Sequence, residues 1–187
     1  GDIYQLSRHV LLGECDGFIS HSWSDHPEHM WPLLREWARS WAETHGRHPL
    51  VWFDLACLEQ TNMLLDMANL PCFLAGCNEL VLLVGPTFFR RLWTVIEIFM
   101  FMEMGGERVT MCCTADFDLA EAIANFDARH CETAHEGDAD TLLAYIKGAC
   151  GTIDEFNVRF DNLMRKATVV RVQLGVGISS EQPMGRT

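Results

Sequence analysis

The chain has 187 residues, which is enough for one α/β domain with some additional chain but not for two full domains. A hydrophobic fraction of 49% supports a substantial core, and a charged fraction of 21% excludes a disordered polyelectrolyte. The formal net charge of −12 leaves no basic surface for a phosphate backbone, so we expect no nucleic acid partner, whereas a few local arginines could still hold an isolated phosphate group.

The strongest strand signals are four short β-rich runs at residues 15–20, 50–54, 80–84 and 109–114. Helix-length segments separate them, and this alternation is typical of βαβ units that build a parallel sheet covered on both faces. A weaker run at residues 125–128 is predicted to supply a fifth strand.

The helix after the first run is predicted to begin near Ser24 and Asp25, which together with Pro27 form a typical N-terminal signature. Gly46 is predicted to end this helix. The side of the helix that faces the sheet is expected to carry Trp31, Leu34, Ala38 and Trp41.

Further helices are predicted at residues 63–75, 92–104, 138–150 and 153–166. Pro71 is expected to break the first of these. The pattern divides the chain into a domain of residues 8–150 and a C-terminal helical extension of residues 151–187, whose tail from Gly175 is expected to be loose.

Eight cysteines are spread along the chain, and none forms a Cys-x-x-Cys pair. We expect free, buried thiols in a reducing compartment, which favours a cytoplasmic location. His26 with His29, and His130 with Cys131, offer zinc-ligand types but no second pair at a metal-like spacing, so we expect no metal site. No apolar run reaches membrane-spanning length, and we expect no membrane partner.

Polar side chains follow the predicted strands at the points where the strands end. The first run leads into Ser20-His21-Ser22-Trp23, the second ends in Asp54, and the third leads into Gly85-Pro86-Thr87-Phe88. Ligands of open parallel sheets bind outside the carboxyl ends of the strands. We therefore expect a functional site at this edge of the sheet.

Glu97 is the one charged residue in the otherwise apolar segment 92–102. A carboxylate in such a helix must face solvent, pair with a base or line a pocket, because a lone buried charge is costly. Trp93 lies one helical turn earlier on the same face, an arrangement that suits a ligand with a flat heterocycle and hydroxyl groups. The alternative, a surface ion pair between Glu97 and Arg90 or another base, stays open at this point.

These segments resemble the TIR (Toll/interleukin-1 receptor) domain family over roughly residues 14–115. The matching motifs, in chain order, are Phe18-Ile19-Ser20-His21 after Asp16, Val51-Trp52-Phe53-Asp54-Leu55 leading into Leu58-Glu59, Leu80-Val81-Leu82-Leu83-Val84 with Gly85-Pro86, and the Trp-x-x-x-Glu element of Trp93 and Glu97. The resemblance implies a flavodoxin-like α/β fold with a five-stranded parallel sheet flanked by helices.

Members of this family either assemble with other TIR domains or cleave NAD⁺ into nicotinamide and linear or cyclic ADP-ribose. The resemblance implies NAD⁺ as substrate, no further cofactor, and Glu97 as the catalytic residue. It also implies a homo-oligomer as the active form. The substrate-binding residues that follow from the motif positions and the predicted edge are Ser20, His21, Trp23, Asp54, Phe88, Arg90, Arg91 and Trp93.

Two departures from the family pattern bear on function. Ser22-Trp23 stands where many NAD⁺-cleaving members carry basic residues, so phosphate binding would fall to Arg90, Arg91 or a neighbouring chain. Residues 55–62 lack the Pro-Gly pair of Toll-type adaptors. Three hypotheses remain: an NAD⁺-cleaving enzyme in immune or cell-death signalling, a non-catalytic assembly module, and a nucleotide-binding sensor.

Overall fold

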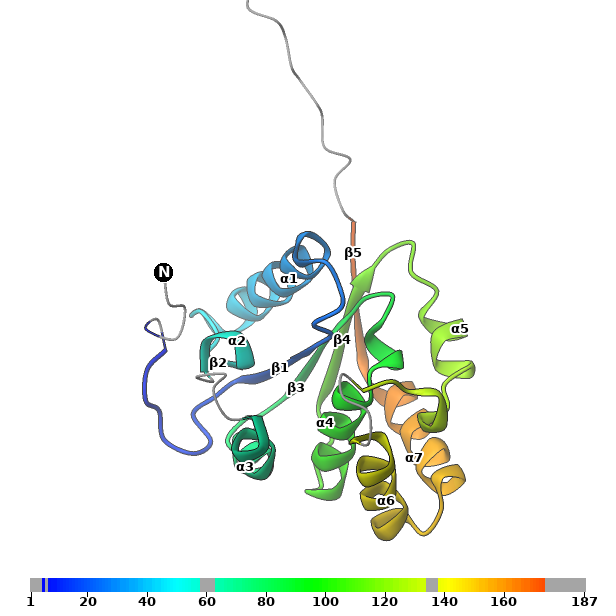
Figure 1. Cartoon of the computed structure of the whole chain (residues 1–187). Helices are drawn as coiled ribbons and strands as arrows, with labels where there is room; N and C mark the ends of the chain where they lie inside the picture. Colours follow the sequence, from blue (N-terminus) through cyan, green and yellow to red (C-terminus); the bar gives the residue numbers. More distant parts are fainter. Residues whose placement is uncertain (1–4, 6, 58–62, 134–137, 174–187) are drawn as a thin grey trace, which may run out of the picture.

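A five-stranded, all-parallel sheet forms the centre of the molecule (Figure 1). The computed structural model describes residues 5, 7–57, 63–133 and 138–173. The strands, β1 Gly17–His21, β2 Val51–Phe53, β3 Leu80–Val84, β4 Val109–Thr114 and β5 Thr168–Val172, lie in the order β2-β1-β3-β4-β5. This is the flavodoxin-like order of an open α/β sheet, and it confirms the predicted fold class.

Helices cover both faces of the sheet. Helix α1, Pro27–His45, packs against one face, where it contributes to the smaller core cluster. The helices α3 Met63–Ala75, α4 Leu92–Glu103, α6 Asp138–Cys150 and α7 Ile153–Lys166 contribute to the larger cluster on the other face. The described residues also form the short helices α2 Asp54–Cys57, η2 Phe88–Arg90, α5 Leu119–Ala124 and η3 Ala128–His130.

The alternation of side chains along the strands fixes which residues point to which helices. In β1, Phe18 belongs to the larger cluster and Ile19 to the smaller one. Successive side chains of a strand point to opposite faces. Ser20 therefore faces α4, and His21 faces the side of α1.

The predicted strand at residues 125–128 is wrong. Asn125 caps the end of α5, Ala128 begins η3, and Phe126 stacks on Phe160 of α7 with ring centroids 3.8 Å apart. The fifth strand is β5, which pairs with β4 from Thr110↔Thr168 onwards. Four of its five residues are not buried, and Arg171 interrupts its valines, so this edge strand lacks the continuous apolar run of β3.

Residues 153–172 belong to the same layered unit as the rest of the chain, whereas the sequence pattern indicated a separate extension. Phe156 and Phe160 of α7 are wholly buried in the larger core cluster, and β5 extends the sheet. The reason is the amphipathic pattern of α7, whose aromatic side needs a core to pack against. The predicted loose tail lies outside the described residues.

Two details of the helices also differ from the predictions. Helix α3 continues through Pro71 without a break, and Leu70 and Leu74 on either side of it are buried. Packing against the core therefore holds the helix although the proline removes a backbone donor. In α1 the side chains that face the sheet are Met30, Leu33 and Trp37, with Leu34, Ala38 and Trp41 at the margin and Trp31 58% exposed.

Candidate functional site

Glu97 lies inside the molecule, on the side of α4 that faces the sheet. The residue is 3% exposed, and the hydroxyl group of Ser20 donates a hydrogen bond to its Oε2 atom at 2.5 Å. Arg90, its suggested surface partner, instead forms an ion pair with Glu132 at 3.2 Å. The surface-pair interpretation of Glu97 is therefore wrong, and the carboxyl group is buried beside the carboxyl end of β1.

The surroundings of Glu97 favour its protonated form. Burial raises the pKa of Glu97 well above that of an ordinary glutamate, and the negative charge of Asp54 acts in the same direction. Hydrogen bonding by Ser20, and by Trp93 one turn away, lowers the pKa but does not outweigh the burial. Among the residues that the structure describes, no cationic group contributes to the pKa of Glu97. A positively charged ligand at this point would lower that pKa.

Asp54 is the second buried acid of the site and follows β2 directly. The indole nitrogen of Trp23 donates a hydrogen bond to its Oδ2 atom at 2.7 Å, and the backbone N–H of Leu55 donates one to Oδ1 at 2.7 Å. Burial raises the pKa of Asp54, against the influence of His21 and of the Trp23 hydrogen bond. Trp23 itself is 55% exposed, so its ring separates the buried carboxyl group of Asp54 from solvent.

His21 lies on the α1 side of the sheet, next to Asp54. Its Nδ1 atom is 3.6 Å from Oδ1 of Asp54, and its ring centroid is 5.0 Å from that of Phe53. Burial lowers the pKa of His21 despite the nearby charges of Asp54 and Asp25. Burial therefore favours the neutral form of both His21 and Asp54.

Asp25 is a site residue that the sequence pattern missed, because it was assigned to the helix start. Its Oδ1 atom accepts hydrogen bonds from the backbone N–H of Thr87 at 3.0 Å and from the Thr87 hydroxyl group at 2.9 Å. That hydroxyl group is 2.6 Å from the hydroxyl oxygen of Ser22. These bonds tie the exit of β1 to the exit of β3. The helix cap is His26, whose ring accepts a hydrogen bond from the N–H of Glu28.

Three residues assigned to substrate binding lie apart from this group. Phe88 is wholly buried in the larger core cluster, where its carbonyl oxygen accepts a hydrogen bond from Thr94. The side chain of Arg90 is 67% exposed and pairs with Glu132. Arg91 precedes α4, and its side chain makes no ion pair within the described part of the chain. The structure brings together Ser20, His21, Trp23, Asp54, Trp93 and Glu97.

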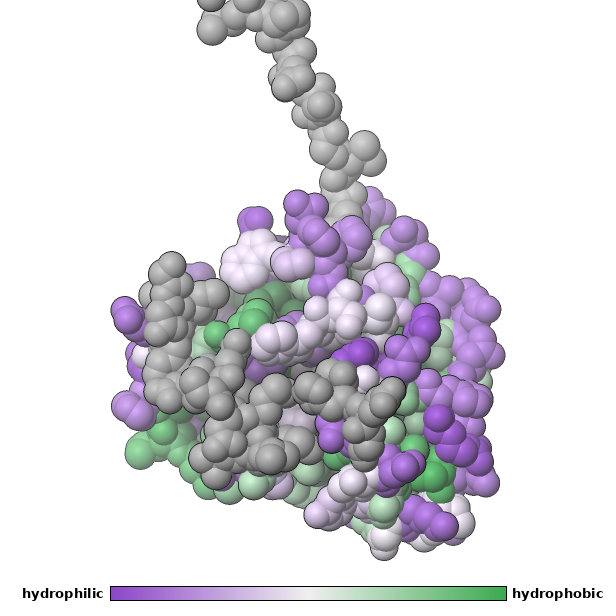
Figure 2. Space-filling view, in the orientation of Figure 1, coloured by the Kyte–Doolittle hydropathy of each residue, from purple (hydrophilic) through white to green (hydrophobic). Residues whose placement is uncertain are grey.

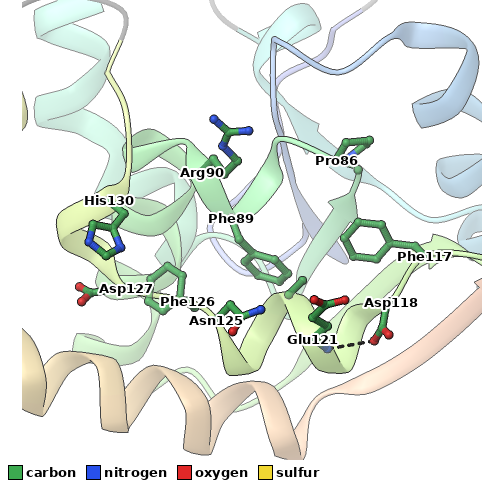
Figure 3. Close-up of a pocket in the computed structure, with 12 residues that line it drawn as sticks. Pro86, Phe89, Arg90, Phe117, Asp118, Glu121, Asn125, Phe126, Asp127 and His130 are labelled. Atoms are coloured by element: carbon green, nitrogen blue, oxygen red, sulfur yellow. Dashed lines mark hydrogen bonds between the residues drawn. The ribbon is translucent and has the colours of Figure 1, made fainter.

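A neighbouring hollow of about 400 Å³ opens at the carboxyl ends of β3 and β4 (Figure 3). Phe89, Phe117 and Phe126 give it apolar walls, and Glu121 points into it from α5. Arg90 is the one predicted site residue that lines it. The hollow adjoins the exit of β3 but does not contain Glu97.

The surface over α5 and α7, at the right of Figure 2, is largely hydrophilic. Within the described ranges no helix is long and apolar enough to cross a membrane. Among the same residues, no three or more histidine, cysteine or acidic side chains gather where they could hold a metal ion. All eight cysteines are free, as predicted, but four are buried, three are partly exposed and Cys72 is exposed.

Comparisons with protein-family models, with curated proteins and with solved structures find no match to this chain. The strand order and the helix layers define the fold as α/β and flavodoxin-like. The resemblance to TIR domains rests on the motifs of residues 14–115 and stays a prediction.

Proposed function

We propose that the chain is an NAD⁺ nucleosidase of the TIR type, with Glu97 as its catalytic residue. The observation that carries the proposal is the buried Glu97 carboxyl group, which is held by Ser20 at the carboxyl end of β1 and has no cationic partner among the described residues. Natural proteins seldom bury an acid without a counter-charge unless it serves a function. A cationic substrate would supply that counter-charge.

The reaction breaks the bond between the nicotinamide nitrogen and the ribose carbon of NAD⁺. Nicotinamide leaves with the bonding electron pair, and water adds to the ribose carbon and releases a proton, so NAD⁺ and water give nicotinamide, ADP-ribose and H⁺. Attack by the adenine base in place of water gives the cyclic product. In either case positive charge develops on the ribose, and a carboxylate beside it stabilises the transition state.

The electrostatics of the site fit a cationic substrate. A positive nicotinamide ring next to Glu97 would lower the pKa of the carboxyl group and favour the carboxylate that the reaction needs. The same positive charge would relieve the repulsion between Glu97 and Asp54. The indole rings of Trp93 and Trp23 offer flat surfaces for a heterocycle.

The second candidate is an assembly module without catalysis. Two large aromatic side chains near the start of α1 favour it, since Trp23 is 55% exposed and Trp31 is 58% exposed. Under this alternative the hydrogen bond between Ser20 and Glu97 only joins α4 to the sheet. The two functions differ in whether Glu97 is needed for turnover of NAD⁺.

The test is the formation of nicotinamide from NAD⁺, followed by chromatography with concentrated protein and with protein crowded on a surface. Glu97→Gln keeps the size of the side chain and an acceptor for Ser20, and we expect it to lower the rate by about 10²- to 10³-fold or more. Glu103→Gln is the matched control, because Glu103 lies on the same helix but pairs with Arg159 at the surface.

Two results would contradict the proposal. Equal rates for the parent protein and Glu97→Gln would remove Glu97 from the reaction. No nicotinamide from the parent, under conditions in which sedimentation shows self-association, would favour the assembly module.

A further inference from the structure

Cys15 and Cys77 lie side by side at the opposite end of the sheet, where the chain enters β1 and β3. The two residues form an isolated parallel bridge. Neighbouring strands lie roughly 4.7–4.9 Å apart. A disulfide needs Cα atoms roughly 4.4–6.8 Å apart, so the backbone already holds these two cysteines within the required range.

The two thiol groups lie close enough to influence each other's pKa. The Cys77 thiol donates a hydrogen bond to the carbonyl oxygen of Phe73 at 3.3 Å, near the end of α3. The adjacent residues Cys112 and Cys113 differ from this pair, because they follow each other in β4 and point to opposite faces of the sheet.

The surroundings make Cys15 the more reactive thiol of the pair. The interaction with the neighbouring Cys77 thiol lowers the pKa of Cys15, against burial and the nearby charges of Asp16 and Glu14. The interaction with Cys15, together with burial, raises the pKa of Cys77. The thiolate is the form that reacts with oxidants, so Cys15 is the attacking group and Cys77 the resolving one.

A small oxidant can reach the pair from the side of Cys77. The Cys77 residue is partly exposed, whereas Cys15 is 8% exposed.

We propose that Cys15 and Cys77 form a reversible oxidation site for hydroperoxides. The Cys15 thiolate attacks the outer oxygen of the hydroperoxide, the O–O bond breaks, and Cys15 becomes a sulfenic acid while the alcohol leaves. The Cys77 thiol then attacks the Cys15 sulfur, which forms the disulfide and releases water. Two thiols and one hydroperoxide thus give one disulfide, one alcohol and one water molecule.

The disulfide would join the segment just before β1 to the second residue after α3. Because α3 packs against α4, the link would restrain the helix beside the one that carries Glu97. The oxidation site depends only on the Cys15–Cys77 geometry and stands apart from the proposed NAD⁺ cleavage.

The experiment treats the folded, fully reduced chain with one equivalent of hydrogen peroxide, blocks remaining thiols by alkylation and identifies linked peptides by mass spectrometry without reduction. We expect a Cys15–Cys77 linked peptide, loss of alkylation at both residues, and full recovery of both thiols with dithiothreitol. Cys15→Ser and Cys77→Ser should each abolish the linked peptide. Cys72→Ser is the matched control. Cys72 is exposed near the end of α3, and its replacement should leave the Cys15–Cys77 link unchanged.

Two outcomes would overturn the inference. The first is that Cys15 and Cys77 both still react with the alkylating reagent after unfolding, while Cys72 is oxidised or disulfides form between chains. The second is a link from Cys15 to Cys57, whose pKa Cys15 also influences, in place of Cys77. Circular dichroism of each serine variant separates a lost disulfide from a lost fold.

Discussion

At the scale of single residues, the raised pKa of Glu97 makes the stability of the protein depend on pH. Burial raises this pKa, so the unfolded chain gives up the carboxyl proton at a lower pH than the folded chain does. Above the ordinary pKa of glutamate, the folded state therefore holds more protons than the unfolded state, and this group makes the free energy of unfolding fall as the pH rises. Below that pH the effect vanishes.

Replacement of Glu97 by glutamine should remove this penalty. We expect Glu97→Gln to be as stable as the parent in acid and increasingly more stable as the pH rises through the raised pKa, because glutamine has no proton to lose. Urea unfolding of both proteins at several pH values measures the difference. A difference in stability that stays constant or shrinks with rising pH would show that the pKa of Glu97 is not raised in the folded state.

Gly85 tests the contact between the exits of β1 and β3. A side-chain carbon at Gly85 would collide with the buried carboxyl group of Asp25, which is fixed by Thr87. We expect Gly85→Ala to lower the free energy of unfolding by about 1–3 kcal/mol. Gly148→Ala is the control, because nothing lies within 4 Å of its new carbon and the helix should gain up to about 1 kcal/mol. Equal effects of the two changes in urea unfolding would contradict the packing of Asp25.

At the scale of helices and strands, α7 and β5 form part of the core. Phe160 contacts Phe89 and Phe126, with ring centroids 5.8 Å and 3.8 Å away, and is wholly buried. We expect Phe160→Ala to cost about 3–5 kcal/mol of stability. Val158→Ala on the exposed side of the same helix should change stability by less than about 0.5 kcal/mol. A small effect at Phe160 in the same unfolding experiment would instead support a dispensable extension.

The sequence pattern predicted the elements that carry a strong, local signal. The bounds of β3, β4, α6 and α7 agree with the predictions, because a continuous apolar run or an amphipathic repeat marks each of them. The fifth strand escaped prediction because Arg171 interrupts its valines and only Val172 is buried, so β5 lacks the continuous apolar run of β3. No local pattern encodes its pairing with β4.

The candidate site could likewise be predicted only where its residues carry a local signal in the sequence. Ser20, Asp54 and Glu97 were found because they follow strands or interrupt an apolar helix. Asp25 was missed because an acid before Pro27 is also what a helix start requires, and its bonds to Thr87 depend on tertiary structure. The burial of Phe88 was likewise invisible, since a phenylalanine after a strand is equally compatible with a pocket wall.

At the scale of the whole molecule, the distribution of cations bears on how NAD⁺ could bind. Arg90 pairs with Glu132, and no arginine or lysine among the described residues pairs with Glu97 or Asp54. Under the proposed function, charge for the diphosphate would come from Arg91 or from a second copy of the chain. We expect the rate per molecule to rise with protein concentration, and this is measured by nicotinamide release alongside sedimentation.

The net charge of −12 makes copies of this chain repel one another. Added salt screens this repulsion, so the rise in activity should begin at a lower protein concentration as the ionic strength increases. A rate per molecule that is independent of concentration and salt would mean that a single chain holds the complete site.

The central claim is that Glu97 meets a positive charge in this site. Its most direct test is an NMR titration of protein labelled with ¹³C at the glutamate carboxyl groups, with Glu97→Gln identifying the Glu97 signal. We expect a titration midpoint above that of ordinary glutamates, and a fall of this midpoint when 1-methylnicotinamide, a cationic fragment of NAD⁺, is added. A Glu97 midpoint that does not respond to saturating 1-methylnicotinamide would contradict the claim.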